Sequence, residues 1–588
     1  MSTSPPPTDT TAKPGTSAGR GGLSARGVRV QAGGQTLVRS VDIDVRPGEL
    51  CAIIGASGAG KSTLVRVLAG VNAPSAGEIT VDGEHIDFAT DSVGYVPTGD
   101  LVHPQLTVRE ALGYAAALRA HDVPAREREA RVEAVLEELH MTHRGDAQVR
   151  SLSDGERRRV ACGTELVGDP SVVVLDEPTS GLDPGLERRL MLLLRELADR
   201  GRAVLVTTHA TGSLRLCDRI IVMASGGRVA FVGSHDETLA HFGATTIDEV
   251  YAAVEDSDDS RDVVAGPTGH AASGGATTTS NASQARRKAP PVSRQIRTLS
   301  SRYALCMRRD ARSLALMIGQ APVIGIAIGL TVPANILSDP TAGGYYGVLL
   351  AFMIVIGAVW LGLIAACREV ARERDALLRE AAVGVRLDAY LLSKCVVIFP
   401  LVAFQTVLLV VPVAVLQPPA GDITQYAGVL AMAIVGAWGA AAIGLLVSVL
   451  VQNAGQATTV LPLVVIPQLL LSGALIPTAK MIVPVRALSD ITLARWVESG
   501  IGNSFKLETA LDSGSSGSIT DFTGLQPSFF GQGLVLPILM AALLTAVTLI
   551  FTAIVLDRRV INAIYDEYDL LDEGPGGGQA VRPVASPA

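Results

Sequence analysis

A glycine-rich segment at residues 55–62 has the spacing Gly-x-x-x-x-Gly-Lys-Ser and directly follows the apolar run 50–54. A strand that ends in such a loop and continues as a helix holds nucleotide phosphates, because glycine lets backbone N–H groups turn toward the phosphate oxygens. Lys61 can reach the β- and γ-phosphates, and Ser62 places a hydroxyl where Mg²⁺ would bind. The residues predicted to form this phosphate-binding site are Gly55, Ala56, Ser57, Gly58, Ala59, Gly60, Lys61, Ser62 and Thr63.

Two acidic residues and a histidine stand at the ends of two further apolar runs. Residues 172–175 lead into Asp176 and Glu177, and residues 204–206 lead through two threonines to His209. Consecutive residues at a strand end point to opposite sides, so one carboxylate can hold Mg²⁺ while the next polarises an attacking water. We therefore predict that Asp176 is a metal ligand, that Glu177 is the general base, and that His209 helps to position the water.

A helix start within residues 151–159 has both a structural and a functional interpretation. Ser153 and Glu156 have the Ser-x-x-Glu spacing of a capping box, which alone explains both residues. The same capped N-terminus also offers Ser153, Asp154 and Gly155 to a bound γ-phosphate, because its N–H groups and dipole favour an anion. We predict that the segment serves both purposes.

The chain is too long for one ordinary domain, and its composition changes along its length. Of its 588 residues 48% are hydrophobic and 18% are charged, which is typical of a protein with soluble and membrane-embedded parts. The predicted fold class is an α/β P-loop nucleotide-binding domain followed by an all-α membrane domain of six helices. The predicted segments are a disordered tail 1–22, the α/β domain 23–250, a flexible linker 251–295, the membrane domain 296–565 and a disordered tail 566–588.

Six apolar windows follow the linker, and each reaches the ~20 residues that a membrane crossing needs. None of them contains Asp, Glu, Lys, Arg or His. A helix buried in a soluble domain is seldom apolar on every side over such a length, so we predict six spans. The prolines in the fifth window leave five or seven spans as alternatives. The predicted spans are 314–337, 345–366, 395–416, 426–451, 456–476 and 533–556.

Basic residues concentrate between the second and third windows and after the sixth. The positive-inside rule then places the α/β domain and both termini in the cytoplasm beneath a cell (plasma) membrane, with residues 477–531 outside. All six cysteines then face the cytosol or its membrane edge, which argues against disulfides. The net charge of −8 gives no basic footprint for nucleic acid, so we expect none as a partner.

The motifs within residues 23–250 together resemble those of the ATP-binding cassette (ABC) superfamily. The matching segments are 55–63 (Walker A), 151–158 (the signature motif, with Ser153, Asp154, Gly155 and Glu156), 172–177 (Walker B), 180–183 (the D-loop, with Asp183) and His209 (the switch histidine). The resemblance implies ATP and Mg²⁺ as ligands and two cassettes that enclose two ATP molecules. The expected partner is a second copy of the chain, with a different half-transporter as the alternative.

The order of a cassette followed by six spans is similar to that of G-subfamily half-transporters, which have an ABC-2 type membrane domain. Residues 94–110, 373–394 and 462–473 look like segments of that group. The resemblance implies an ATP-driven exporter. The charge-free spans favour an apolar or amphiphilic substrate, such as a lipid, a glycolipid or a hydrophobic drug, within membrane lipid. The alternative is an ATP-sensing membrane scaffold that turns ATP over slowly.

Three positions depart from the family pattern. Thr98 stands where the Q-loop glutamine is expected, Ala32 stands near the position of an adenine-stacking aromatic residue, and Asp154 replaces a glycine of the signature motif. Thr98 is too short to contact both Mg²⁺ and the attacking water. Asp154 places a negative charge near the partner's γ-phosphate unless Arg157 or Arg158 offsets it. We therefore expect Thr98→Gln and Asp154→Gly to raise ATP hydrolysis.

Two features of the predicted membrane domain suggest how it packs and moves. Residues 368–386 are rich in Arg and Glu and are predicted to form an amphipathic helix at the inner surface that takes up the cassette's motion, with a solvated loop as the alternative. Gly436, Ala440 and Gly444 recur at every fourth residue and predict a close approach of two helices.

Overall fold

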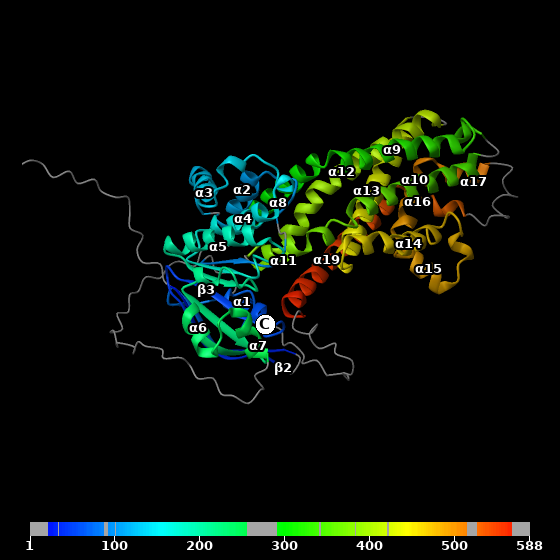
Figure 1. Cartoon of the computed structure of the whole chain (residues 1–588). Helices are drawn as coiled ribbons and strands as arrows, with labels where there is room; N and C mark the ends of the chain where they lie inside the picture. Colours follow the sequence, from blue (N-terminus) through cyan, green and yellow to red (C-terminus); the bar gives the residue numbers. More distant parts are fainter. Residues whose placement is uncertain are drawn as a thin grey trace, which may run out of the picture. The chain divides into compact units, whose positions relative to one another are not determined.

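The computed structural model describes residues 22–32, 35–86, 92–99, 102–120, 122–255, 291–339, 343–382, 384–419, 423–513 and 526–566. These residues form two compact units, one made mainly of residues before 288 and one made of residues 288–564 (Figure 1). Almost all of the two predicted tails and most of the predicted linker lie outside the described residues. Helices α7 (Ile247–Glu255) and α8 (Val292–Arg309) extend into the predicted linker from its two ends.

The first unit is built on a six-stranded sheet. Its strands are β3 (Leu50–Gly55), β6 (Val93–Val96), β7 (Val172–Leu175), β8 (Ala203–Thr207), β9 (Arg219–Ala224) and β10 (Arg228–Gly233). The order is β10-β9-β3-β8-β7-β6, and every pair is parallel except β10 with β9. Strands β3, β7 and β8 are buried along their whole length, as parallel strands covered on both faces must be.

A second, antiparallel sheet shares its core with the first. Its strands are β1 (Leu23–Ala32), β2 (Gln35–Val45), β4 (Ala76–Val81) and β5 (Glu84–His85), in the order β2-β1-β4-β5. Helix α1 (Lys61–Leu68) buries Leu64, Val65 and Leu68 in a hydrophobic core with side chains from β1, β2, β3, β7 and β8. The loop before α1 is therefore held between two sheets.

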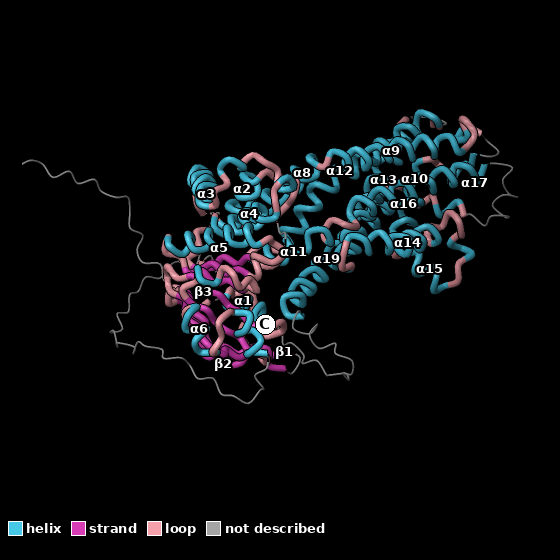
Figure 2. Tube along the Cα trace, viewed as in Figure 1, coloured by secondary structure: helices cyan, strands magenta, loops and turns pink. Residues whose placement is uncertain are grey.

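The remaining elements of the first unit are helical. They are α2 (Val108–Arg119), α3 (Ala125–Glu138), η1 (Thr142–Arg144), η2 (Val149–Ser151), α4 (Asp154–Leu166), α5 (Pro184–Asp199), η3 (Leu214–Leu216), α6 (His235–Phe242) and α7. Helix α2 packs against α3 and α4. Among the described residues, strands occur only in this first unit (Figure 2).

Helices are the only regular secondary structure among the residues of the second unit that the structure describes. Its elements are α8, α9 (Ala311–Thr331), η4 (Ile336–Ser338), α10 (Gly343–Ala366), η5 (Ala371–Glu373), α11 (Arg374–Ala382), α12 (Leu387–Leu416), α13 (Thr424–Leu450), α14 (Ala454–Leu470), η6 (Thr478–Lys480), α15 (Val483–Asp490), α16 (Leu493–Ser504), α17 (Leu507–Ser513), η7 (Pro527–Phe529) and α19 (Val535–Asp566). The predicted fold class, an α/β domain followed by a helical domain, is confirmed.

Five of the described helices are long and apolar enough to cross a membrane, namely α9, α10, α12, α13 and α19. The fifth predicted span, 456–476, corresponds to α14, which has only 17 residues. At 1.5 Å per residue α14 is about 26 Å long, less than the ~30 Å hydrocarbon core. The predicted span extends too far because apolar residues continue beyond Leu470, where α14 ends, into a turn in which Gly473 has a φ of 92°. The six-span count thus includes one short helix.

Helices α10 and α13 approach each other closely at small residues. A Cβ at Gly362 in α10 would lie 2.1 Å from a backbone oxygen of α13, and one at Gly444 in α13 would lie 2.9 Å from the oxygen of Leu363. The predicted close approach is confirmed at Gly444. Gly436 faces a different neighbour, Val497 of α16.

Helix α16 lies within residues 477–531, which were predicted to face outward. Residues 493–502 of this helix are all buried. The helix packs against α13 and α10. Part of this segment therefore belongs to the core of the helical unit.

Candidate functional site

The predicted site residues of the first unit follow three neighbouring strands. The glycine-rich loop follows β3, Asp176 and Glu177 follow β7, and His209 follows β8, which lies between the other two strands. Because these strands are parallel, their carboxyl ends meet at one edge of the sheet, where α/β proteins bind ligands.

The glycines of the loop after β3 are required by its geometry. Gly55, Gly58 and Gly60 have φ values of 148°, 79° and 85°, which residues with a side chain rarely adopt. A Cβ at Gly55 would lie 2.2 Å from the oxygen of Met223. Gly60 is the N-cap of α1 and makes no side-chain cap, so the first N–H groups of α1 have no capping side chain. This helix start has the features of an anion-binding site.

Lys61 is the cation of this loop. Its side chain is buried, and Nζ donates hydrogen bonds to the carbonyl oxygens of Gly55 and Ala56, both at 2.8 Å. Burial lowers the pKa of Lys61 below its ordinary value. An ammonium held by carbonyl groups in a buried place interacts more strongly with an incoming anion than one in water.

One carboxylate oxygen of Asp176 accepts hydrogen bonds, and the other has no partner. Oδ1 accepts hydrogen bonds from Ser62 Oγ at 3.1 Å and from Thr207 Oγ1 at 2.8 Å. Oδ2 is buried and has no hydrogen-bond partner. Burial raises the pKa of Asp176, although the hydrogen bonds from Thr207 and Ser62 lower it. A buried carboxylate oxygen without a partner is costly, and a bound cation would satisfy it.

The donor set fits Mg²⁺. Asp176 and Ser62 are in hydrogen-bond contact and both offer oxygen. Among the described residues, no group of three or more His, Cys, Asp and Glu side chains forms a metal site. Mg²⁺ suits such a sparse set, because it binds through one or two protein oxygens together with phosphates and water.

Glu177 and His209 face each other beside this pair. His209 Nε2 lies 3.1 Å from Glu177 Oε1, and both side chains are partly exposed. Glu177 has a φ of 46°, which is strained for a residue with a side chain, and its N–H donates to Thr207 Oγ1 at 2.8 Å. Strain of this kind concentrates at functional sites.

The sequence analysis missed two residues of this region. Thr207 contacts both consecutive acids, through Asp176 Oδ1 and the backbone N–H of Glu177. Tyr251 of α7 stacks near His209, with ring centroids 6.4 Å apart, and burial raises its pKa to about 12. Thr207 could have been inferred from its place at the end of β8, whereas Tyr251 lies in a short helix without a motif.

The helix start at Ser153 is a capping box, as predicted. Ser153 Oγ accepts from the N–H of Glu156 at 3.4 Å, and Glu156 Oε2 accepts from the N–H of Ser153 at 2.9 Å. Asp154 forms an ion pair with Arg157 one turn along α4. Gly155 is buried, and a Cβ there would lie 3.2 Å from Leu186. The charge of Asp154 is thus offset within its own helix.

The other predicted positions lie apart from the cluster at the strand ends. Asp183 caps α5, accepting from the N–H groups of Gly185 at 2.9 Å and Leu186 at 3.0 Å. Thr98 is exposed. Gly99, which follows it, accepts a hydrogen bond at 2.7 Å from Arg158 of α4. Ala32 ends β1, and its side chain lies outside what the structure describes.

The structure thus brings five predicted residues together, and we call them the strand-end cluster: Lys61, Ser62, Asp176, Glu177 and His209. Ser153, Asp154 and Asp183 make their polar contacts within their own helix starts. Within the described part of the chain, the signature segment and the strand-end cluster are therefore separate.

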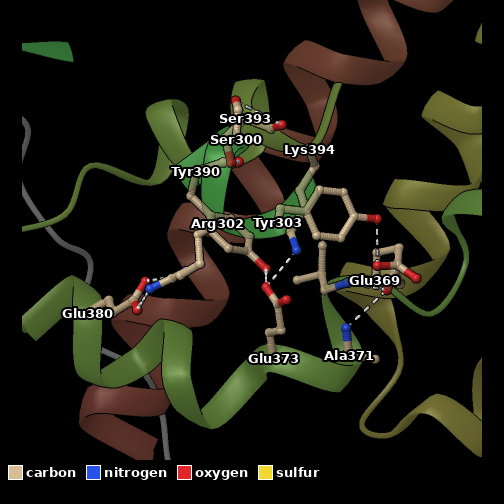
Figure 3. A network of polar contacts seen from close by, with 12 residues as sticks. Ser300, Arg302, Tyr303, Glu369, Ala371, Glu373, Glu380, Tyr390, Ser393 and Lys394 are labelled. Carbon is tan, nitrogen blue, oxygen red and sulfur yellow. Dashed lines mark hydrogen bonds and ion pairs between the residues drawn. The ribbon is translucent and has the colours of Figure 1, made fainter. Parts of the chain in front are cut away.

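A second group of charged side chains lies in the helical unit (Figure 3). We call it the Lys394 network, and its members are Arg302, Tyr303, Glu369, Glu373, Glu380, Tyr390 and Lys394. It joins α8, the segment 369–380 and α12. The predicted amphipathic helix 368–386 is in fact two short helices, η5 and α11, held by buried contacts.

Lys394 is the centre of this network. Its ammonium lies 2.6 Å from Glu373 Oε2 and 3.8 Å from the centre of the Tyr303 ring. Tyr390 donates to Glu373 at 3.1 Å, and Tyr303 donates to Glu369 at 2.6 Å. The buried Lys394 therefore has a carboxylate and an aromatic face as partners.

Comparisons with known proteins agree with the division of the chain into a nucleotide-binding unit and a helical unit. Residues 38–180 match the family described as ABC transporter, and residues 294–505 match the family described as ABC-2 type transporter. An ABC transporter ATP-binding/permease protein of Mycobacterium tuberculosis is 36% identical over 513 residues, which cover 81% of this chain and 56% of that protein. The chain therefore spans about half the length of this relative.

Two further relatives match shorter parts of the chain. The Nod factor export ATP-binding protein I of Ralstonia nicotianae is 37% identical over 234 residues, which cover 39% of this chain and 72% of that protein. The ABC transporter G family member 14 of Dictyostelium discoideum is 37% identical over 222 residues, which cover 36% of this chain and 15% of that protein.

Proposed function

Since the chain belongs to the ABC transporters and carries an ABC-2 type membrane domain after its cassette, we propose that it is an ATP-driven exporter. The observation that carries this proposal is the strand-end cluster, in which Asp176 keeps one buried oxygen open, in the same chain as five long apolar helices. The protein is a multi-pass membrane protein. We place its cassette in the cytoplasm, where ATP is available, on the basis of the basic loops.

The residues of the glycine-rich loop would bind the phosphates of ATP. Backbone N–H groups at the start of α1 and the buried Lys61 ammonium oppose the phosphate charge. Ser62 and Asp176 would hold Mg²⁺, which supplies positive charge to the β- and γ-phosphate oxygens when it is bound. Thr207 donates a hydrogen bond to Asp176 Oδ1, so that Oδ2, which has no partner, would bind the cation.

Glu177 and His209 would act on the attacking water. Glu177 is partly exposed and accepts from His209, so its carboxylate can polarise a water while the imidazole fixes its direction. The backbone contact from Glu177 to Thr207 links this carboxylate to the metal-binding side of the cluster. Tyr251 stacks beside His209.

Hydrolysis would require a second cassette. The signature helix start at Ser153 makes its contacts locally, and one chain has one glycine-rich loop and one signature segment. We propose a homodimer in which Ser153 and Gly155 of one copy complete the ATP site of the other. A heterodimer with another half-transporter is the alternative outcome of a mass measurement in nanodiscs.

The substrate class is proposed from the membrane domain. The middle parts of the five long helices carry no ionisable residues, so the path favours an apolar or amphiphilic molecule, such as a lipid, a glycolipid or a hydrophobic drug. One relative is described as a Nod factor export ATP-binding protein, which supports export as the direction.

A slow, ATP-sensing scaffold is the second candidate function, and the exposed Thr98 at the Q-loop position favours it. One assay on purified full-length protein separates the two. The exporter predicts vanadate-sensitive ATP hydrolysis that is stimulated by a transported compound in a screen of lipids, glycolipids and hydrophobic drugs. ATP binding without measurable hydrolysis would reject the exporter and support the scaffold.

A further inference from the structure

A pocket in the helical unit lies where the ends of two long helices meet the segment after α10. It is formed by η5 and α11, by the last turn of α13 and by the later part of α19, and it is partly open to solvent. Ser448 Oγ of α13 accepts hydrogen bonds from the backbone N–H groups of Val370 and Ala371, at 2.9 and 3.0 Å. These bonds fix the wall formed by η5 against α13.

Among the residues that the structure describes, two arginines line this pocket and no carboxylate does. Arg374 makes no hydrogen bond or ion pair with any other described residue. Arg559 donates to the oxygen of Val449 at 3.1 Å, in the last turn of α13, and has further N–H groups left. The neighbouring acids Asp375 and Asp557 are exposed and do not line the pocket.

Two buried arginines elsewhere in the described residues do have acidic partners. Arg302 pairs with Glu380, and Arg202 pairs with Glu138. Two guanidinium groups that line one pocket repel each other, and an anion bound between them would offset this repulsion. Guanidinium groups bind phosphate strongly because their N–H donors match its oxygens.

The rest of the pocket is apolar. Leu377, Leu556 and Val560 are buried in its walls, and Leu378 and Val451 complete them. The pocket lies at the end of the apolar part of α19, Val535–Val560, where a membrane-spanning helix reaches the headgroup layer. The ligand that fits is therefore an anion with an apolar tail located at the membrane surface.

We propose that this pocket binds the phosphate of an anionic phospholipid between Arg374 and Arg559, with the lipid's acyl chains along Leu556 and Val560. Basic pockets between membrane helices commonly bind anionic headgroups. The proposal concerns the helical unit alone, so it stands or falls independently of ATP hydrolysis. Arg559 also caps α13, and the test must separate this structural role from lipid binding.

The test measures lipid selection by the full-length protein. The wild type and Arg374→Gln/Arg559→Gln are placed in nanodiscs of phosphatidylcholine with increasing phosphatidylglycerol, and retained lipids are counted by native mass spectrometry. The matched control is Arg372→Gln/Arg558→Gln, which removes two exposed arginines next to the pocket residues. We expect the pocket variant to lose about fivefold of phosphatidylglycerol preference for each arginine, and the control to keep most of it.

Two further arms make every outcome decisive. Leu378→Trp fills the pocket while both arginines remain, and it should also lose the preference, even if the double variant fails to fold. Soluble glycerol 3-phosphate should not displace the bound lipid. Equal preference in the wild type and in Leu378→Trp would overturn the proposal. So would an equal loss in the exposed control, or full displacement by glycerol 3-phosphate, which would indicate a soluble phosphate ligand.

Discussion

The strand-end cluster and the Lys394 network both bring charged residues together, but the charged groups are fully paired only in the Lys394 network. In that network Lys394, Tyr303 and Tyr390 all have carboxylate partners, and Arg302 pairs with Glu380. In the strand-end cluster Asp176 Oδ2 has no partner and Glu177 has a strained φ of 46°.

The difference indicates what each group is for. A fully paired polar network rigidifies a structure, and losing one member leaves a buried charge uncompensated. A buried oxygen without a hydrogen-bond partner, beside a strained residue, costs free energy unless a ligand binds to it. Changes in the strand-end cluster should therefore alter activity and leave stability intact, whereas changes in the Lys394 network should alter stability first.

The largest expected effect is on turnover. Glu177→Gln should slow ATP hydrolysis by about 10²–10⁴-fold, the usual contribution of a general base, and should leave ATP binding intact because Lys61 and Asp176 remain. Steady-state hydrolysis and nucleotide binding by the same preparation measure both. Wild-type turnover in Glu177→Gln would show that another group is the base.

The Lys394 network should respond in the opposite way. Lys394→Met should destabilise the protein by about 3–5 kcal/mol, because it leaves Glu373 without its cation. Thermal melting in nanodiscs measures this loss, with the exposed Arg372→Met as control. Adding Glu373→Gln should recover part of the stability, since the two residues interact directly. A Lys394→Met protein as stable as the control would mean that the network is not structural.

The next effect concerns Thr98. Thr98→Gln should raise hydrolysis about tenfold, because a longer amide can reach both the metal and the water, and a gain of ~1.4 kcal/mol at the transition state corresponds to that factor. The measurement is turnover at saturating ATP, and Thr98→Asn serves as a shorter amide control. If neither variant is faster than the wild type, Thr98 does not limit the rate.

The smallest effect concerns Asp154. The ion pair with Arg157 supplies the offset that the sequence analysis left open, so Asp154→Gly should raise hydrolysis by less than Thr98→Gln. Exposed pairs contribute about 0.2–1 kcal/mol. Arg157→Ala should therefore slow hydrolysis up to about fivefold in the wild type, and have no effect in Asp154→Gly. Equal effects of Arg157→Ala in both backgrounds would exclude this coupling.

Local patterns predicted the geometry of the glycine-rich loop and of the helix start at Ser153, whereas long-range contacts could not be predicted. The glycine spacing at residues 55–60 and the capping box at Ser153 are encoded within a few residues, and the structure has both. Tyr251 and the partners of Lys394 lie in segments far apart in the sequence. No spacing rule connects such residues before the fold is known.

In the helical unit, the sequence likewise did not predict where one helix ends or which helix is buried. Hydropathy locates apolar residues but not the point where a helix ends, so the window 456–476 ran past the end of α14. Helix α16 has a mixed sequence with Arg495 and Glu498, which conceals that it is buried against α13 and α10. Its burial depends on packing partners that composition does not indicate.

The claim that the strand-end cluster is an open ligand site is tested most directly by Asp176→Asn. Thermal melting is followed with ATP, with and without Mg²⁺, and with Lys61→Ala as the variant that loses ATP binding. The wild type should gain about 2.7 kcal/mol at 100 times the dissociation constant. Asp176→Asn should lose the Mg²⁺-dependent part of this gain and be at least as stable as the wild type without ligand. A Mg²⁺-dependent gain that survives in Asp176→Asn, or a ligand-free protein destabilised like Lys394→Met, would contradict the account.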